Sequence, residues 1–161
     1  MYKDTITLFN RVSGGWIPTV LTGVDLNADR GAIIQQYGAN STDNAKLHII
    51  CGTDGSVNGI SVHSPKSYAG EGIAFRYGND FDFFWHGVWE EPTPVESETV
   101  ESETAESVTV AETVAEDDPP IKDSDYTNGF YDYMRKNFDE VYCITSVARY
   151  SVIPHYEILA R

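Results

Sequence analysis

The chain has 161 residues and a formal net charge of −14, and 12% of its residues are aromatic. This length corresponds to one ordinary domain. The longest apolar runs, such as Phe83-Phe84-Trp85, are far shorter than the roughly 20 residues of a membrane-spanning helix. The first residues, Met1 to Ile6, lack the apolar core of a signal peptide, which predicts a cytosolic protein.

Short strand patterns fill the first ninety residues. Apolar residues alternate over residues 2–9, where Ile6 and Leu8 share a face, and over residues 45–51, where Leu47 and Ile49 do so. Ser13-Gly14-Gly15 is typical of a hairpin turn between the first two strands. Further strand-like runs are predicted over residues 16–20, 24–26, 57–62, 72–76 and 80–85.

Two helices are expected. Asn27 can cap a short helix over residues 28–37, which Gly38 would end. A second helix should follow Ser124, a good N-cap residue. Its apolar residues recur at a spacing of four: Phe130, Met134 and Phe138.

Two strands are predicted at the end of the chain, over residues 140–147 and 151–159, joined by a turn near residues 148–151. In the last strand, Val152, Tyr156 and Ile158 would share one register. About eight strands with short connections predict a mainly β (α+β) fold with one or two short helices. We therefore expect a small β-barrel or sandwich, with residues 1–161 as a single β-rich domain.

The negative charge belongs to one segment. Between Glu90 and Asp125 lie thirteen of the 25 acidic residues and one of the 11 basic residues, so the rest of the chain is nearly neutral. Val-Glu-Ser-Glu-Thr occurs at residues 95–99 and again at 100–104, and aromatic residues are absent from 91–120. Such a stretch buries too little apolar area to offset its ordering entropy. A disordered acidic insertion is therefore predicted over residues 91–123.

No catalytic, cofactor or metal site is expected. The sequence has no phosphate-binding loop, no G-x-S-x-G motif and no helical histidine pair. Alternation would place Asp80 and Asp82 on one strand face, where they could form a metal site or acid/base pair, and Asp25 lies near Asp29; a solvated face is the commoner arrangement. The histidines are interpreted as structural or surface residues: His48 (solvent-facing), His63, His86 and His155.

Two cysteines, Cys51 and Cys143, lie in apolar stretches far apart in the sequence. Neither has a second Cys or a His at the spacing of a metal site. Both are interpreted as buried, reduced thiols.

The two ends of the chain resemble a known family. Residues 3–10 read Lys-Asp-Thr-Ile-Thr-Leu-Phe-Asn, followed by Trp16 and by Thr-Val-Leu-Thr-Gly-Val over residues 19–24. The closing stretches are Ile-Thr-Ser-Val over residues 144–147 and Pro-His-Tyr-Glu-Ile over residues 154–158. These are similar to the first and last strands of the head-closure, or head-completion, proteins in the head-to-tail connector of tailed phages and prophages.

The resemblance implies a non-enzymatic virion protein with a β-barrel body and a loop that projects toward the DNA channel. It would form a homo-oligomeric ring between the portal-adaptor ring and a tail-completion or tail-tube protein, in the virion neck after assembly in the host cytoplasm. An acidic channel lining repels DNA phosphates. The interaction residues would then be acidic: Glu96, Glu98, Glu101, Glu103, Glu106, Glu112, Glu116, Asp117 and Asp118.

An alternative is an acidic phage-encoded inhibitor, a DNA mimic or anti-CRISPR-like protein that blocks a host nuclease by protein–protein binding. The net charge of −14 suits that class. A mimic is expected to hold its carboxylates on a rigid face, whereas here they lie in a low-complexity stretch. Direct sequence-specific binding of nucleic acid is not expected, because the 11 Lys and Arg residues are scattered.

Overall fold

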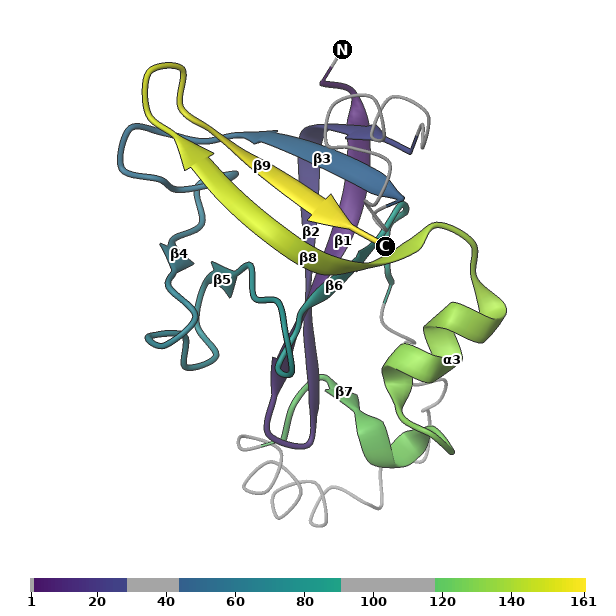
Figure 1. Cartoon of the computed structure of the whole chain (residues 1–161). Helices are drawn as coiled ribbons and strands as arrows, with labels where there is room; N and C mark the ends of the chain where they lie inside the picture. The colour runs from purple at the N-terminus through teal and green to yellow at the C-terminus, as the bar shows by residue number, and fades with distance from the viewer. Residues whose placement is uncertain (1, 29–43, 91–117) are drawn as a thin grey trace, which may run out of the picture.

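The computed structural model describes residues 2–28, 44–90 and 118–161 (Figure 1). The helix expected over residues 28–37 lies, apart from its first residue, outside these ranges. The described elements are β1 (Asp4–Val12), β2 (Gly15–Asn27), β3 (Ala45–Ile50), β4 (Val62–His63), β5 (Ile73–Ala74), β6 (Phe83–Trp85), β7 (Ile121–Lys122), the 3₁₀ turn η2 (Asp123–Asp125), α3 (Phe130–Asn137), β8 (Val141–Tyr150) and β9 (His155–Ala160).

Six strands close on themselves as a barrel. The neighbours run β1-β6-β8-β9-β3-β2, and β2 pairs back with β1, so each of these strands has two partners within the barrel. All six pairings are antiparallel. In Figure 1, β3, β8 and β9 cross the long β1–β2 hairpin. Closure pairs the sheet edges, and it agrees with the mainly β fold expected from the sequence.

Strands from both sides of the acidic segment build this one barrel. β8 and β9 follow that segment in sequence, yet they lie between β6 and β3, which precede it. Phe83 of β6 pairs with Cys143 of β8, and Ile49 of β3 pairs with Tyr156 of β9. The last two strands therefore complete a sheet that residues 4–85 begin.

The β1–β2 hairpin turns at Ser13-Gly14, between the paired residues Val12 and Gly15. Gly14 has a φ of 80°, a backbone conformation that favours glycine, so the predicted turn is confirmed. The expected break between residues 20 and 24 is wrong. Gly23, at φ 67°, is the extra residue of a bulge inside a continuous β2, because Asp4 pairs with Val24 and Thr5 with Thr22.

Two buried clusters form the core. The alternating residues predicted to face inward, Ile6, Leu8, Leu47, Ile49 and Ile158, lie in the barrel cluster and are at most 1% exposed. A second, largely aromatic cluster lies where α3 packs against the barrel. Its fully buried members are Phe9, Trp16, Phe83, Phe130 and Met134.

The strand predicted over residues 57–62 is wrong. Val57 and Ile60 hydrogen-bond to each other across a tight turn, in which Asn58 and Gly59 both have positive φ. Of this run, only Val62 lies in a strand, the two-residue β4, which pairs in parallel with β5. Local turn geometry therefore overrides the apolar pattern here.

The predicted C-terminal limit of the acidic insertion, residue 123, is also wrong, because β7 pairs Ile121 with Trp16 and Lys122 with Gly15. The rest of the predicted insertion, residues 91–117, lies outside the described residues. Ser124 does not cap α3, which begins at Phe130 after Gly129. The Asp123 carboxylate instead accepts the amide hydrogen of Phe130 at 2.9 Å.

The last hairpin turns at residues 151–154, later than predicted, because β8 continues to Tyr150. Tyr156 and Ile158 face inward as expected, but Val152 lies in the turn and is exposed. Within the described ranges, no helix has the length and apolar character to cross a membrane.

Candidate functional site

Of the nine acidic residues expected to contact a partner, only Asp118 lies in the described part of the chain. Its Oδ2 is 3.0 Å from Nζ of Lys122. That hydrogen bond is the main reason why the pKa of Lys122 lies above its usual value. Both side chains are substantially exposed, so this ion pair is a surface contact at the start of β7.

Asp80 and Asp82 lie in different environments. Asp82 is fully buried, and its carboxylate accepts hydrogen bonds from the backbone NH groups of Arg11 and Arg76 and from Nε and Nη2 of Arg76. The side-chain hydrogen bonds between Arg76 and Asp82 are the main cause of a raised pKa of Arg76. Asp80 is exposed. Asp82 is therefore a structural anchor between β1 and the loop before β6, and the predicted same-face pair is not formed.

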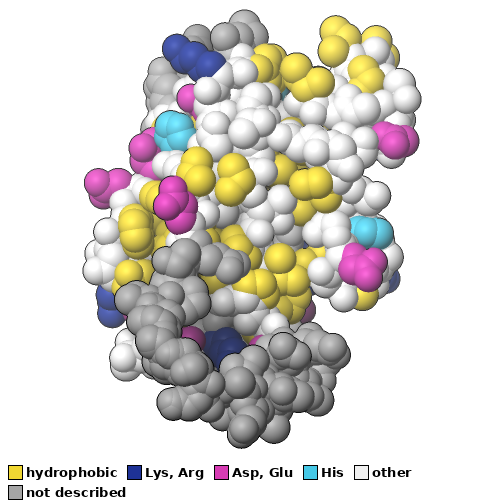
Figure 2. Space-filling model, turned by 180° about the vertical axis from the view of Figure 1, so that it is seen from behind, with side chains coloured by type: hydrophobic (Ala, Val, Ile, Leu, Met, Phe, Trp, Pro, Cys, Tyr) yellow, Lys and Arg dark blue, Asp and Glu magenta, His cyan; other side chains and the backbone are white. Residues whose placement is uncertain are grey.

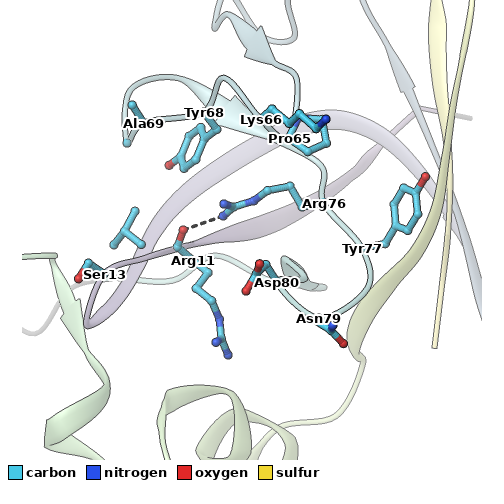
Figure 3. A pocket seen from close by; sticks show the side chains of 12 residues that line it. Arg11, Ser13, Pro65, Lys66, Tyr68, Ala69, Arg76, Tyr77, Asn79 and Asp80 are labelled. Atoms are coloured by element: carbon cyan, nitrogen blue, oxygen red, sulfur yellow. Dashed lines mark hydrogen bonds between the residues drawn. The ribbon is translucent and has the colours of Figure 1, made fainter.

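An open cleft of about 790 Å³ lies beside this anchor (Figure 3). Arg76 Nη2 donates to the carbonyl oxygen of Arg11 at 2.6 Å, and the Arg76 guanidinium lies 4.8 Å from the centroid of the Tyr68 ring. Asp82 neutralises Arg76, so the other charged residues that line the cleft are Arg11, Lys66 and Asp80. Among the described lining residues, no nucleophile is hydrogen-bonded to a base.

An apolar tip is the most exposed hydrophobic feature of the described structure. We define it as Ile50, Tyr150, Val152 and Ile153, which lie at the end of β3 and around the β8–β9 turn. Val152 is 94% exposed and Ile153 is 74% exposed. Figure 2 shows hydrophobic side chains gathered at the upper right, where this turn projects from the barrel. Contiguous exposed apolar groups are typical of interaction surfaces.

The apolar tip is held in a defined position. Nη2 of Arg149 donates to the Thr53 carbonyl at 3.0 Å, and the Tyr156 hydroxyl donates to the Gly55 carbonyl at 3.1 Å. The Cys51 NH also donates to the carbonyl of Pro154 at 3.2 Å. These bonds tie β8, β9 and the turn to the loop after β3, so the exposed side chains lie on an anchored support.

The histidines lie in three places. His48 is half-buried, with Glu157 and Asp25 beside it, and His155 stacks on Tyr150. His86 lies between Glu140 and Asp4. His63 packs near Tyr68. One potential ligand atom from each of His48, His155 and Glu157 lies within 4.8 Å of the others.

Both cysteines are free thiols, as expected. Cys51 is buried, whereas Cys143 is only half-buried. Burial is the main cause of a raised pKa of Cys143, so its reactive thiolate form is disfavoured.

Sequence reasoning missed both the apolar tip and the grouping of His48 with His155 and Glu157. Pro154 was the available signal for the tip, because proline marks strand ends and turns. The histidine grouping depends on the pairing of β3 with β9. Comparison with protein-family models, with curated proteins and with solved structures gave no match.

Proposed function

We propose that this chain is a non-enzymatic structural subunit of a tailed-phage head-to-tail connector, a head-closure protein that assembles as a ring. The observation that carries the proposal is the apolar tip. Val152 and Ile153 project into solvent from an anchored hairpin, although apolar side chains of this kind are stabilised by burial. A second copy of the chain, seated against the tip, would bury them.

The position of the tip suits a ring. A heterologous contact, in which one patch meets a different patch on the next copy, closes into a ring when the rotation between copies is right. The tip lies at one end of the barrel, away from α3 at the other end (Figure 1). Each subunit would thus contact one neighbouring copy through the tip, and its remaining surface would contact the other neighbouring copy and the adaptor.

The sequence resemblance supports the same function. Its opening stretch forms β1 and most of β2, and its closing stretches lie in β8 and β9. These four strands belong to the barrel, and the turn between β8 and β9 carries Val152 and Ile153 of the apolar tip. The portal-adaptor ring on one side and a tail-completion or tail-tube protein on the other are the partners that such a subunit would contact.

Light scattering and negative-stain imaging of the whole chain, alone and mixed with the portal-adaptor complex of its phage, test the proposal. We expect a ring or incorporation on the adaptor. Val152→Asp combined with Ile153→Asp should abolish both, because charges would be buried at the contact. Val88→Asp is the matched control, since Val88 is 50% exposed and lies outside the tip.

A chain that stays monomeric and ignores the adaptor would contradict the proposal. The inhibitor alternative would then be tested with a host nuclease. Binding that disappears when Glu96, Glu98, Glu101 and Glu103 are changed to Gln, but survives the tip substitutions, would support the inhibitor instead.

A further inference from the structure

A row of ionisable residues crosses three strands on the outside of the barrel. Asp25 of β2 pairs with His48 of β3, and His48 pairs with Glu157 of β9. Their sequence neighbours Leu47, Ile49 and Ile158 face the core, so the row points outward. His155 is two residues before Glu157 and therefore lies on the same face of β9.

The spacing within this group suits a single small ion. Nε2 of His48 lies 3.1 Å from Oε2 of Glu157. One ligand atom from each of His48, His155 and Glu157 lies within 4.8 Å of the others. Metal–ligand bonds of about 2.0–2.2 Å in a tetrahedral site place ligand atoms about 3.3–3.6 Å apart. The His48–Glu157 pair already has nearly this spacing, and small side-chain rotations bring in His155.

Each imidazole has a second polar neighbour, and that of His155 is at hydrogen-bond distance. Nδ1 of His155 is 2.7 Å from the carbonyl oxygen of Ile153, which can only accept, so Nδ1 carries the hydrogen and Nε2 offers its lone pair. Nδ1 of His48 lies 3.9 Å from Oδ2 of Asp25. A carbonyl or carboxylate behind the ligating histidine is the usual arrangement in metal sites, where it fixes the ring and raises its basicity.

Aromatic packing also fixes the orientation of the His155 ring. The His155 ring stacks on Tyr150, with centroids 4.9 Å apart and planes 14° apart. On its other side it meets the His48 ring edge-on at 5.7 Å. All three ligand residues are half-buried, so an ion could enter from solvent while its ligands keep few alternative orientations.

We propose that His48, His155 and Glu157 bind one divalent transition-metal ion of the Zn²⁺ type, with Asp25 as the positioning carboxylate behind His48. Two imidazole nitrogens and one carboxylate oxygen form a ligand set typical of zinc. Mg²⁺ and Ca²⁺ prefer oxygen-only ligands. Three protein ligands leave a fourth position for water. The site joins β3 to β9 immediately beside the apolar tip, and its existence does not depend on the connector function.

Titration calorimetry of the untagged full chain with ZnCl₂ tests the site, and Co²⁺ absorption reports the geometry. We expect one Zn²⁺ per chain and a tetrahedral Co²⁺ spectrum. His155→Ala and Glu157→Gln should each weaken Zn²⁺ binding by more than about tenfold, and Asp25→Asn by about tenfold. His63→Ala is the matched control, because this half-buried histidine lies outside the group, and it should bind like the unchanged chain.

A second measurement separates lost ligation from lost folding. Zn²⁺ should raise the melting temperature of the unchanged chain and of His63→Ala, because a ligand that binds only the folded state stabilises it. The melting temperature of His155→Ala should not respond, although circular dichroism should show a folded barrel. Absence of Zn²⁺ binding to the unchanged chain, or equal binding by folded His155→Ala, would overturn the proposal.

Discussion

The indole Nε1 of Trp16 donates a 2.9 Å hydrogen bond to Oδ1 of Asp123. The same oxygen accepts the backbone NH of Phe130 at 2.9 Å. One carboxylate oxygen therefore connects β2 to the first turn of α3, across the fully buried Trp16 side chain. The Asp123 carboxylate therefore holds the edge of the aromatic cluster beneath α3 by hydrogen bonds.

Asp123→Ala should lower the free energy of unfolding by about 1–3 kcal/mol, because it removes a helix-capping carboxylate and leaves the indole NH unsatisfied. Urea denaturation followed by tryptophan fluorescence measures the change. Asp125→Ala is the control, since Asp125 is exposed on the same 3₁₀ turn. Equal stability of the two variants would contradict the anchoring role.

Asp82→Asn should lower the free energy of unfolding by about 3–5 kcal/mol, because it leaves the largely buried Arg76 guanidinium without a counter-charge. Thermal and urea unfolding check this value. Asp80→Asn changes an exposed residue, so its free energy of unfolding should stay within about 0.5 kcal/mol of that of the unchanged chain. A mild effect of Asp82→Asn would show that the anchor contributes little to stability.

Stability should fall in alkaline solution. Burial is the main cause of raised pKa values at Tyr68, Tyr126, Tyr131, Tyr142 and Tyr156. The folded state therefore holds these protons more tightly than the unfolded state. This contribution is complete below the unfolded tyrosine pKa of about 10 and is lost as pH rises through the higher folded values.

Urea denaturation at about pH 8 and at about pH 10.5 measures this loss, while phenolate absorbance follows the titration itself. Tyr131→Phe removes one of the titrating groups and should make the pH dependence shallower. A free energy of unfolding that is the same at both pH values would contradict the prediction.

Cys143 should react slowly with a thiol reagent in the native protein. Its raised pKa leaves a smaller thiolate fraction at neutral pH than an exposed cysteine has, so the rate should increase as pH rises through and above the usual thiol range. A colorimetric disulfide reagent measures the rate, with the urea-unfolded chain as reference and Cys143→Ser to assign the signal. Fast labelling of native Cys143 at neutral pH would contradict it.

Period-two alternation was enough to predict which side chains fill the barrel. Ile6 with Leu8 and Leu47 with Ile49 point inward because neighbouring residues of a strand face opposite sides. The same signal cannot define β4, β5 and β7, since a two-residue strand has no periodicity to detect, and β5 is only part of the run predicted over residues 72–76. Val152 shows the opposite error: it fits the pattern of the last strand, but the hairpin turn displaces it into solvent.

The contacts that define the candidate sites have no local signal. His48 and Glu157 are 109 residues apart in the sequence, and Trp16 and Asp123 are 107 apart. Each pair meets only because strand pairing fixes its register. Sequence patterns predicted the body of the fold, whereas the metal-ligand group and the helix anchor required the three-dimensional pairing.

Because β8 and β9 close the barrel, the barrel cannot close until the end of the chain has left the ribosome. Until the residues of β8 and β9 emerge, β6 lacks its β8 partner and β3 lacks its β9 partner, so both present unpaired edges. Unpaired edges template association between chains. A nascent or truncated chain that stops before Val141 is therefore the form most exposed to misassembly, and completion of the last 21 residues removes both edges at once.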